Sequence, residues 1–493
     1  MNFDEILKLY GYVHLDHRKI PDLHYVKPNN YSKFKEFLNR NRDRKFSISV
    51  DNDGDGAVSA KLLRYTLLDF GITDIQLVYQ AIPHEVGADM VNACKSGNRV
   101  AIILDSSSNN KKLIEDLNNN KIESLIIDHH ELNNGMLEYY ETLDTVTVIS
   151  NKNEKEELTD LSCGMYIYFL MHFYYEDHGK SALEYFDLAV LSLTSDVCPM
   201  DKPYHRSIMR KYLNNKDRNR FISSFTGKYT YFNASLLSMH ITPRINALFR
   251  TESYQLLHEL ITDVCLDQIH KHVNEVYKQN KRILANVMDQ LTIYDYGNVM
   301  YANVKDYPSY FIASNYTGLL ANKILERYRK PCIVTCAKDN GIYKGSIRSN
   351  VDMNIHNTLE SSPYIIKSGG HTLAHGFTAY GKDIEEIIYT FNDISINKTE
   401  PISIQINSLS ELNNYFNVIN DIAQFNEFTG SGVDCIGFTY KVQPFDDIEI
   451  NNAYSAINGT VKVIAFSRIF VGLELYITPR VSASGIEFIA QIR

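Results

Sequence analysis

Three aspartates alternate with small or polar residues directly after a short apolar run. The segment reads SISVDNDGDGAVSAKLL and places Asp51, Asp53 and Asp55 within five positions, with two glycines among them. The run before Asp51 is β-branched and predicts a buried strand, and the residues that follow the motif predict a helix. Carboxylates crowded in this way repel one another, so the segment indicates a site at which cations neutralise them.

Further acidic and imidazole groups follow other apolar runs. Asp105 follows AIIL, Asp128 follows SLII, and Asp196 follows LAVLSLTS, while His129 and His130 come directly after Asp128. In an open parallel sheet, ligands bind beyond the carboxyl ends of the strands. We therefore expect these side chains to converge at one edge of a sheet.

Hard oxygen ligands with one imidazole suit Mn²⁺ or Mg²⁺. The acidic groups are more than one ion needs, which favours two ions about 3.5–4 Å apart, the arrangement used for phosphoester hydrolysis. A DxDGDG motif also occurs in calcium loops, but the downstream glutamate of an EF-hand is missing. Ser106, Ser107 and Ser108 follow Asp105, but no base pairs with them in the sequence, so we do not expect a covalent serine intermediate.

The elements that must position these residues alternate between strands and helices. Helical patterns occupy 57–69 and 110–119, and this alternation predicts a parallel sheet covered on both faces. The predicted strands are 46–50, 74–80, 99–104, 123–128 and 145–150.

The rest of the chain predicts further domains. Residues 252–291 keep helical spacing without proline or glycine and predict one long bridging helix. Its outer face carries Lys271, Lys278, Lys281 and Arg282, either as a solvated face or as a patch that follows a phosphate backbone. Residues 396–402 resemble a linker, and strands are expected at 434–442, 460–466 and 470–481. The expected domains are 1–45 (lead-in), 46–250 (catalytic), 251–295 (connecting helix), 296–398 (second α/β domain) and 403–493 (β-rich).

Composition is that of a soluble globular protein. The 493 residues carry a formal net charge of −9, which counts mildly against a nucleic-acid binder but leaves local basic patches possible. No apolar run reaches the roughly 18 residues that span a bilayer, and no signal peptide is expected. Seven scattered cysteines without a CxxC pair fit a reducing cytoplasm and exclude a structural zinc site.

These segments resemble a known family. DNDGDGAVSA, LDSS, IDHHE and DLAVLSLTSDVCPM resemble the four motifs of the DHH phosphoesterase superfamily. TPRINALFR is similar to a segment of RecJ nucleases, and NYTGLLANKILERYRKPCIV, GSIRS and SGGHTLAHGF are similar to the DHH-associated (DHHA1) domain. The resemblance covers residues 46–380. Ser107 departs from the family, because glycine is usual there, and Phe249 replaces a glycine in PRINALFR.

The resemblance implies an α/β fold. A parallel-sheet DHH domain would be joined by a long helix to a smaller α/β DHHA1 domain, followed by a β-rich domain similar to an oligonucleotide-binding (OB) fold. It also implies a 5′-to-3′ exonuclease that releases 5′ mononucleotides from single-stranded DNA in repair, recombination or replication, with two Mn²⁺ or Mg²⁺ ions. We expect a monomer, with a single-strand-binding protein or a helicase as further partners.

Resemblance and geometry together suggest roles. Asp51 and Asp53 would hold one metal, and Asp105 would bridge the two. The other metal would be held by Asp55, His129 and Asp196. Asp128 would orient the imidazoles, and His130 would donate to the scissile phosphate.

The second domain would bind substrate. Arg348 and Arg250 would recognise a terminal 5′-phosphate, because the guanidinium fork matches phosphate oxygens. Arg244 and Asn246 would contact the nucleotide or brace the wall between domains. The full substrate-binding set is Arg244, Asn246, Arg250, Ser346, Arg348, Ser349, Gly369, Gly370 and His371.

Two other functions remain open. One is an oligoribonuclease or small-nucleotide phosphodiesterase of the same superfamily, although such relatives are usually shorter and lack the PRINA segment. The other is an inactive DNA-binding replication subunit. The presence of a suitable residue at every expected ligand position argues against it.

Overall fold

The computed structural model describes residues 1–493 except 81–85, 227–231, 235, 265, 305–309, 338–340, 352, 372, 395–402, 431–432, 451–454, 460, 466–468, 483–484 and 493. The chain forms two compact units. The first contains Met1–Asn246, Tyr254–His270 and Ile402–Arg493, and the second contains Ala247–Ser253 and Lys271–Pro401. None of the helices in the described part has the length and hydrophobicity of a transmembrane helix.

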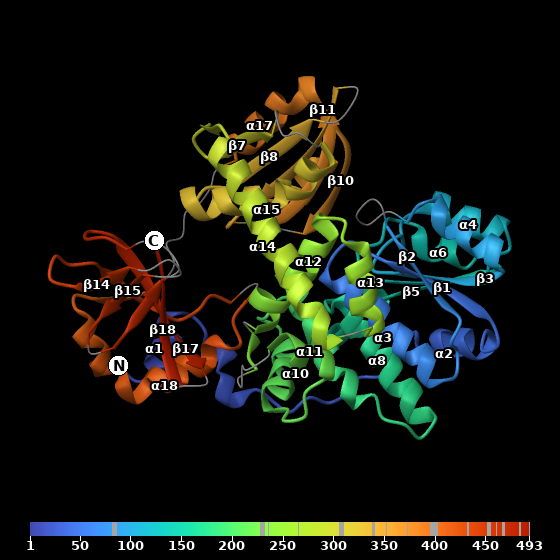
Figure 1. Ribbon diagram of the computed structural model, residues 1–493, viewed down its shortest axis with the longest axis horizontal. Helices are drawn as coiled ribbons and strands as arrows, with labels where there is room; N and C mark the ends of the chain where they lie inside the picture. Colours follow the sequence, from blue (N-terminus) through green and yellow to red (C-terminus); the bar gives the residue numbers. More distant parts are fainter. Residues whose placement is uncertain are drawn as a thin grey trace. The chain divides into compact units, whose positions relative to one another are not determined.

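A parallel sheet lies among helices in the N-terminal α/β part of the first unit (Figure 1). Its strand order is β2-β1-β3-β4-β5, and every neighbouring pair is parallel. Runs of β-branched residues produce these strands, and β4 is buried along its whole length. The five predicted strands are confirmed: β1 Lys45–Val50, β2 Ile75–Tyr79, β3 Arg99–Leu104, β4 Ser124–Asp128 and β5 Val146–Ser150.

Helices surround this sheet. Met90 of α4 and Leu117 of α5 pack with Ile103 of β3 and Ile126 of β4 in one hydrophobic cluster. The helices within residues 1–250 are α1 Phe3–Leu9, α2 Tyr31–Arg40, α3 Gly54–Asp69, α4 Ala88–Gly97, α5 Lys111–Asn119, α6 Met136–Tyr140, α7 Glu156–Thr159, α8 Cys163–Asp177, α9 Phe186–Ser195, α10 Pro203–Asn214, α11 Arg220–Thr226, the π-helix Leu236–Ile241 and α12 Thr242–Arg250, and α1 lies away from this sheet (Figure 1).

The prediction of one long helix over 252–291 is wrong in one respect, because the segment forms two helices, α13 Tyr254–Thr262 and α14 Leu266–Gln290. Asp263 has a left-handed backbone with φ 62°, which ends α13. The buried ammonium of Lys61 donates to the carbonyls of Leu260 and Ile261 at 3.0 and 3.1 Å, and to the Asp263 carboxylate at 2.6 Å. A side chain far away in sequence therefore caps the helix.

The second unit contains the predicted second α/β pattern. Its six-stranded sheet has the order β10-β11-β9-β8-β7-β6, in which only β7 and β8 are parallel neighbours. One hydrophobic cluster joins α14 and α15 to the sheet, and a second joins α16 and α17. The elements are β6 Ile293–Asp295, β7 Met300–Val304, α15 Tyr310–Tyr328, β8 Cys332–Ala337, β9 Ile342–Arg348, α16 Ile355–Glu360, β10 Ile365–His371, β11 Ala374–Tyr380 and α17 Ile384–Asn392.

The C-terminal part is β-rich, as predicted, and also contains an unpredicted helix, α18 Phe416–Asn426. Its mixed sheet has the order β12-β13-β17-β18-β16-β15-β14. The buried Arg206 of α10 joins the C-terminal part to the N-terminal region, because it donates to the carbonyls of Leu15 and of Phe428, which follows α18. The strands are β12 Ile404–Ile406, β13 Phe438–Lys441, β14 Asp447–Ile450, β15 Ser455–Asn458, β16 Val463–Ala465, β17 Glu474–Ser482 and β18 Gly485–Ile492.

Candidate metal centre

Carboxylates gather at the carboxyl ends of three neighbouring strands. Asp51 directly follows β1, Asp105 directly follows β3, and Asp128 is the last residue of β4. All three are buried, and Asp196 joins them from the end of α9. The convergence expected from a parallel sheet is therefore present in the structure.

Two glycines allow the aspartate motif to fold tightly. Asp53 caps α3 and accepts a 2.9 Å hydrogen bond from the backbone N–H of Gly56. A Cβ at Gly56 would lie 2.6 Å from the Cβ of Asp51, and one at Gly54 would lie 2.1 Å from the hydroxyl of Ser195 on α9. A side chain at Gly56 would displace the backbone of Asp51, and one at Gly54 would displace the Ser195 side chain.

The acidic and imidazole groups form three overlapping sets whose possible ligand atoms lie within 4.8 Å of one another. Nε2 of His129 lies 3.2 Å from Oδ1 of Asp105, and Nδ1 of the same ring lies 3.6 Å from Oδ2 of Asp196. The sets are Asp51, Asp53 and Asp105; Asp105, His129 and His130; and Asp55, His129 and Asp196. Asp105 and His129 each belong to two sets and connect the cluster.

Asp55 is held by donors from two other helices. The backbone N–H groups of Cys163 and Gly164, at the start of α8, donate to its carboxylate at 2.8 and 2.9 Å. Ser192 of α9 donates at 2.5 Å and Ser59 at 3.2 Å, both to Oδ1. Burial, together with the charges of Asp196 and Asp53, nevertheless raises the pKa of Asp55 to about 7. The carboxylate is oriented, but its negative charge is not neutralised.

The loop after β3 is conformationally strained. Asp105 and Ser107 have left-handed backbones, with φ of 60° and 73°. Non-glycine residues in this region cost of order 1–3 kcal/mol. Burial and the neighbouring carboxylates of Asp55 and Asp53 raise the pKa of Asp105 well above its usual range. Glycine is favoured at position 107 because it adopts the left-handed backbone without strain, and this chain has serine there instead.

Asp128 organises the two histidines and the strained loop. Its Oδ1 lies 2.7 Å from Nδ1 of His130 and accepts the backbone N–H groups of His129 and His130, while its Oδ2 accepts the N–H of Ser108. Burial would raise the pKa of Asp128, but His130, His129 and Ser108 outweigh burial and hold it below its usual range. Asp128 therefore remains ionised.

The donor set fits hard divalent cations. It consists of carboxylate oxygens and imidazole nitrogens, and the mutual repulsion of Asp55 and Asp105 is of the kind that cations relieve. Two buried thiols lie beside the cluster. Burial and the charge of Asp55 raise the pKa of Cys163, and burial with Asp196 and Asp55 raises that of Cys198. Neither thiol belongs to any of the three sets of possible ligands, so the ligand atoms of these sets are oxygen and nitrogen.

Helix α12 begins beside this cluster. The Thr242 methyl group lies 3.5 Å from where a Cβ of Gly54 would be. Arg244, in the first turn of α12, uses Nη1 to donate to the His240 carbonyl at 2.5 Å. The Asn246 side-chain oxygen is buried and has no hydrogen-bond partner within the described residues.

The other predicted substrate residues lie in the second unit. Arg348 of β9, Ala374 of β11 and His371 of β10 are in register across three strands. Arg348 donates from Nη1 to the Ile347 carbonyl at 2.8 Å, and burial lowers its pKa. The His371 side chain is outside the described part. Arg250 accepts a 3.5 Å hydrogen bond at its carbonyl from Asn315.

Two predicted serines already have local partners. Ser346 shares a 2.9 Å hydroxyl contact with Thr317, and Ser349 donates to the Val351 carbonyl at 2.6 Å. Gly370 has φ 147°, and a Cβ there would lie 2.4 Å from the Ala374 carbonyl, so glycine is required by the hairpin itself. Gly369 has no neighbour within 4 Å of its Cβ position and leaves that edge open.

The sequence did not reveal the support of Asp55. A Cβ at Gly164, at the start of α8, would lie 2.6 Å from the Ser192 hydroxyl and 3.1 Å from the Asp55 carboxylate. Its small size serves the packing of α8 against α9. No local signal joins residues that are more than a hundred positions apart.

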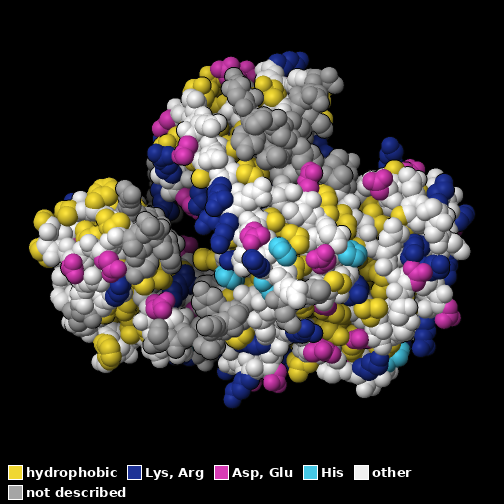
Figure 2. Space-filling view, viewed as in Figure 1, with side chains coloured by type: hydrophobic (Ala, Val, Ile, Leu, Met, Phe, Trp, Pro, Cys, Tyr) yellow, Lys and Arg dark blue, Asp and Glu magenta, His cyan; other side chains and the backbone are white. Residues whose placement is uncertain are grey.

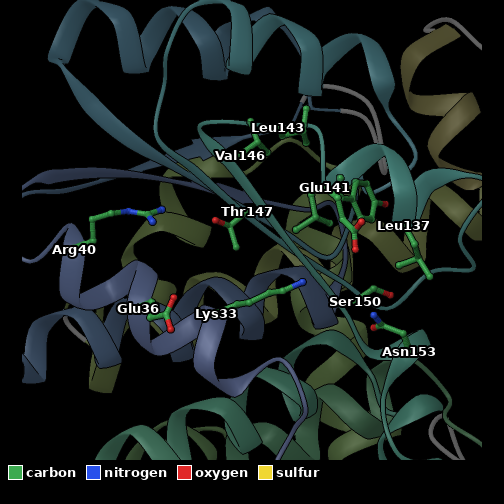
Figure 3. A pocket seen from close by; sticks show the side chains of 12 residues that line it. Lys33, Glu36, Arg40, Leu137, Glu141, Leu143, Val146, Thr147, Ser150 and Asn153 are labelled. Carbon is green, nitrogen blue, oxygen red and sulfur yellow. The ribbon is translucent and has the colours of Figure 1, made fainter.

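A separate pocket lies on edge strand β5, between α2 and α6 (Figure 3). Its volume is about 570 Å³, and it contains none of the clustered carboxylates. Lys33 and Arg40 of α2 and Glu141 line it, and Arg40 is paired with Glu123. The chemistry-bearing residues are therefore elsewhere.

Comparisons with known proteins agree with this geometry. The model of the DHH family, N-terminal domain, matches residues 45–193. The single-stranded-DNA-specific exonuclease RecJ of Haemophilus influenzae is 24% identical over 400 residues, covering 71% of this chain and 66% of that protein. RecJ of Dickeya dadantii is 22% identical over 409 residues, with the same coverage. The chain thus spans about two thirds of the length of these curated relatives.

Solved structures show the same fold. RecJ from Thermus thermophilus in complex with Mn²⁺ has a TM-score of 0.72 at 18% identity, covering 99% of this chain and 75% of that one. The Mg²⁺ complex from the same organism has a TM-score of 0.65 at 15% identity, covering 99% and 73%. The resemblance of the sequence motifs, the parallel sheet and the family match agree. Residues 45–193 are therefore similar to the N-terminal domain of the DHH family, and the chain has the fold of the RecJ structures.

Proposed function

We propose that this protein is a divalent-cation-dependent exonuclease that hydrolyses single-stranded DNA from its 5′ end. The observation that carries the proposal is the convergence of carboxylates and imidazoles at one edge of the sheet. The curated relatives are single-stranded-DNA-specific exonucleases, which supports the substrate class. The cellular role that follows is DNA repair, recombination or replication.

Two Mn²⁺ or Mg²⁺ ions would occupy the cluster. Asp51 and Asp53 would hold one ion, and Asp105 would serve both, because it belongs to sets on either side. The second ion would be held by Asp55, His129 and Asp196. When bound, such ions activate a water and neutralise charge on the scissile phosphate.

The chain's own residues prepare the site for phosphate. Asp128 lies 2.7 Å from Nδ1 of His130 and fixes the ring, and with both ring nitrogens protonated, Nε2–H would donate to a phosphate oxygen. The same carboxylate ties the strained loop after β3 to the histidine segment through Ser108. Arg244 and Asn246 of α12 would contact the nucleotide next to the scissile phosphate.

The second unit would bind the DNA end. Arg348 and Arg250 would contact the 5′-phosphate, since a guanidinium matches two phosphate oxygens. Gly369 and Gly370 of edge strand β10 would allow the DNA backbone to approach, with Ser346, Ser349 and His371 beside them.

The test compares strands labelled at the 5′ end with strands labelled at the 3′ end, in Mn²⁺. Early release of labelled mononucleotide only from the 5′ label supports the proposal. Release from the 3′ label first contradicts the direction. Faster cleavage of dinucleotides than of strands of about 30 nucleotides would favour a small-nucleotide phosphodiesterase instead. Binding without turnover in Mn²⁺ would identify an inactive DNA-binding subunit.

A further inference from the structure

Two β-turns at one end of the C-terminal sheet expose large apolar side chains. Residues 443–446 form the first turn, with a backbone hydrogen bond from Asp446 to Gln443, and residues 470–473 form the second, with one from Leu473 to Phe470. Phe445 is 77% exposed, Phe470 61% and Val471 50%. Figure 2 shows hydrophobic side chains gathered on this β-rich part of the chain.

The two turns are neighbours. Val442 exchanges backbone hydrogen bonds with the second turn, accepting from Gly472 at 2.9 Å and donating to Leu473 at 2.8 Å. These bonds continue the antiparallel ladder of β13 and β17 past Lys441 and Glu474. Both turns therefore emerge from the same end of one strand pair.

The first turn is held rigidly. Both carboxylate oxygens of Asp446 accept from the Tyr440 hydroxyl, at 2.8 and 2.7 Å, and Oδ2 also accepts the backbone N–H of Gln443 at 2.7 Å. Phe445 therefore projects from a fixed backbone rather than from a loop that could fold it inward. A rigid aromatic anchor loses little conformational entropy when a partner covers it.

The charges around the turns are mainly negative. Three acidic residues, Asp446, Asp447 and Glu474, lie in the turns or next to them in the chain, against two cations, Lys441 and Arg468, that precede the turns by two residues each. Residues 402–493 carry nine acidic and five basic residues, a net charge of −4. This balance repels a phosphate backbone and attracts Lys and Arg side chains.

We propose that the turns around Phe445 and Phe470, together called the tip surface (residues 443–446 and 470–473), bind a segment of another protein whose apolar side chains are flanked by Lys or Arg. Exposed aromatic anchors supply the apolar contact, and the acidic rim supplies complementarity. The surface contains none of the residues assigned to hydrolysis.

The test uses the full chain and a fluorescent peptide of about 12 residues with a Leu-Phe-Leu centre and Lys-Arg flanks. A second peptide has the same centre and Asp-Glu flanks. Binding is measured by fluorescence polarisation. The protein should bind the basic peptide with a lower Kd than the acidic one. Phe445→Ala with Phe470→Ala should weaken this binding by about 30-fold, as loss of an anchor does.

Phe416→Ala is the matched control. Phe416 is 75% exposed in the same domain, but it follows Tyr415, whose ring packs on Phe438 at the start of β13 with centroids 4.9 Å apart. The tip surface lies past the other end of that strand. The control should leave peptide binding unchanged, and all variants should keep the wild-type rate of DNA hydrolysis.

Several results would overturn the proposal. They are absence of binding, equal binding of both peptides, or equal binding by the double variant. Loss of affinity for a dT strand of about 30 nucleotides in the double variant would make the tip surface a base-stacking platform instead. A dimer in analytical ultracentrifugation that the double variant abolishes would assign the surface to a second copy of this chain.

Discussion

The hydroxyl of Ser192 donates a 2.5 Å hydrogen bond to Oδ1 of Asp55 and so joins helix α9 to helix α3 at the buried side of the carboxylate cluster. The same oxygen accepts from the backbone N–H of Gly164 on α8. Three helices therefore meet at one carboxylate. The orientation of Asp55 toward His129 and Asp196 depends on donors that do not themselves bind a cation.

Ser192→Ala should weaken cation binding more than it weakens the fold. Partners of this kind orient metal ligands, and their loss typically costs about 10- to 100-fold in metal affinity. We expect the Mn²⁺ concentration at half-maximal activity to rise by about 10-fold or more. Ser59→Ala is the control, because Ser59 donates to the same oxygen over a longer 3.2 Å. If both variants matched the wild type in Mn²⁺ titration, the positioning role of Ser192 would be lost.

Asp55 should make the metal-free protein less stable as pH rises. The folded-state pKa of Asp55 is raised from 3.8 to about 7, so its protonated form stabilises the fold below pH 4. This contribution disappears as pH rises through 7, at a cost of a few kcal/mol. Buried histidines such as His17 and His205 have lowered pKa values and act in the opposite direction over part of this range. The wild type and Asp55→Asn are therefore compared in a chelator: the wild-type melting temperature should fall relative to that of the variant between pH 4 and 8, and Mn²⁺ should restore it at pH 8. Parallel profiles of the two proteins would contradict the unneutralised cluster.

Ser107→Gly should stabilise the protein. Ser107 has φ 73°, which glycine adopts without strain, so the change should raise the free energy of unfolding by about 1 kcal/mol. Activity should be kept, because no role in hydrolysis is assigned to the Ser107 hydroxyl. In the control Ser108→Gly, the backbone is not in the left-handed region, and glycine should lower stability. The free energy of unfolding of both variants is measured with denaturant. Equal losses of this free energy in the two variants would refute the strain argument.

Arg348→Ala should slow cleavage of 5′-phosphorylated strands. A charge-assisted hydrogen bond contributes about 1.5–3 kcal/mol, so end binding should weaken roughly 10- to 100-fold. The defect should shrink on 5′-hydroxyl strands, which lack the contact, and Arg348→Lys should recover only part of it because lysine has no fork. Arg348 also donates to the Ile347 carbonyl. Equal loss on both substrates with a lower melting temperature would assign Arg348 to the fold.

The sequence predicted the sheet and the cluster because both depend on local patterns. The β-branched runs before Asp51, Asp105 and Asp128 became strands β1, β3 and β4, and the parallel-sheet rule brought their ends together. Asp196 follows a helix, α9, and reaches the same place. Residue types at the ends of elements were therefore sufficient to find the candidate ligands.

Long-range contacts were not predictable in this way. The break between α13 and α14 depends on Lys61, which lies about two hundred residues before Asp263 and donates to it. The hydrogen bonds that orient Asp55 come from α8 and α9, and Arg206 of α10 binds the C-terminal part through the carbonyl of Phe428, just after α18. Helix 416–426 was missed because its sequence was interpreted as part of a β-rich region. Packing, rather than propensity, decides each of these features.

The most direct test of the proposed function is to measure Mn²⁺ stoichiometry and DNA hydrolysis in one preparation of the wild type and of Asp105→Asn. Asp105 connects two sets of ligands, so its neutral isostere should lose at least one of two bound ions and fall below about 1% of wild-type activity. The variant should remain folded, because asparagine keeps the shape and removes a buried like charge. Two bound ions and full hydrolysis in Asp105→Asn would contradict the two-cation account.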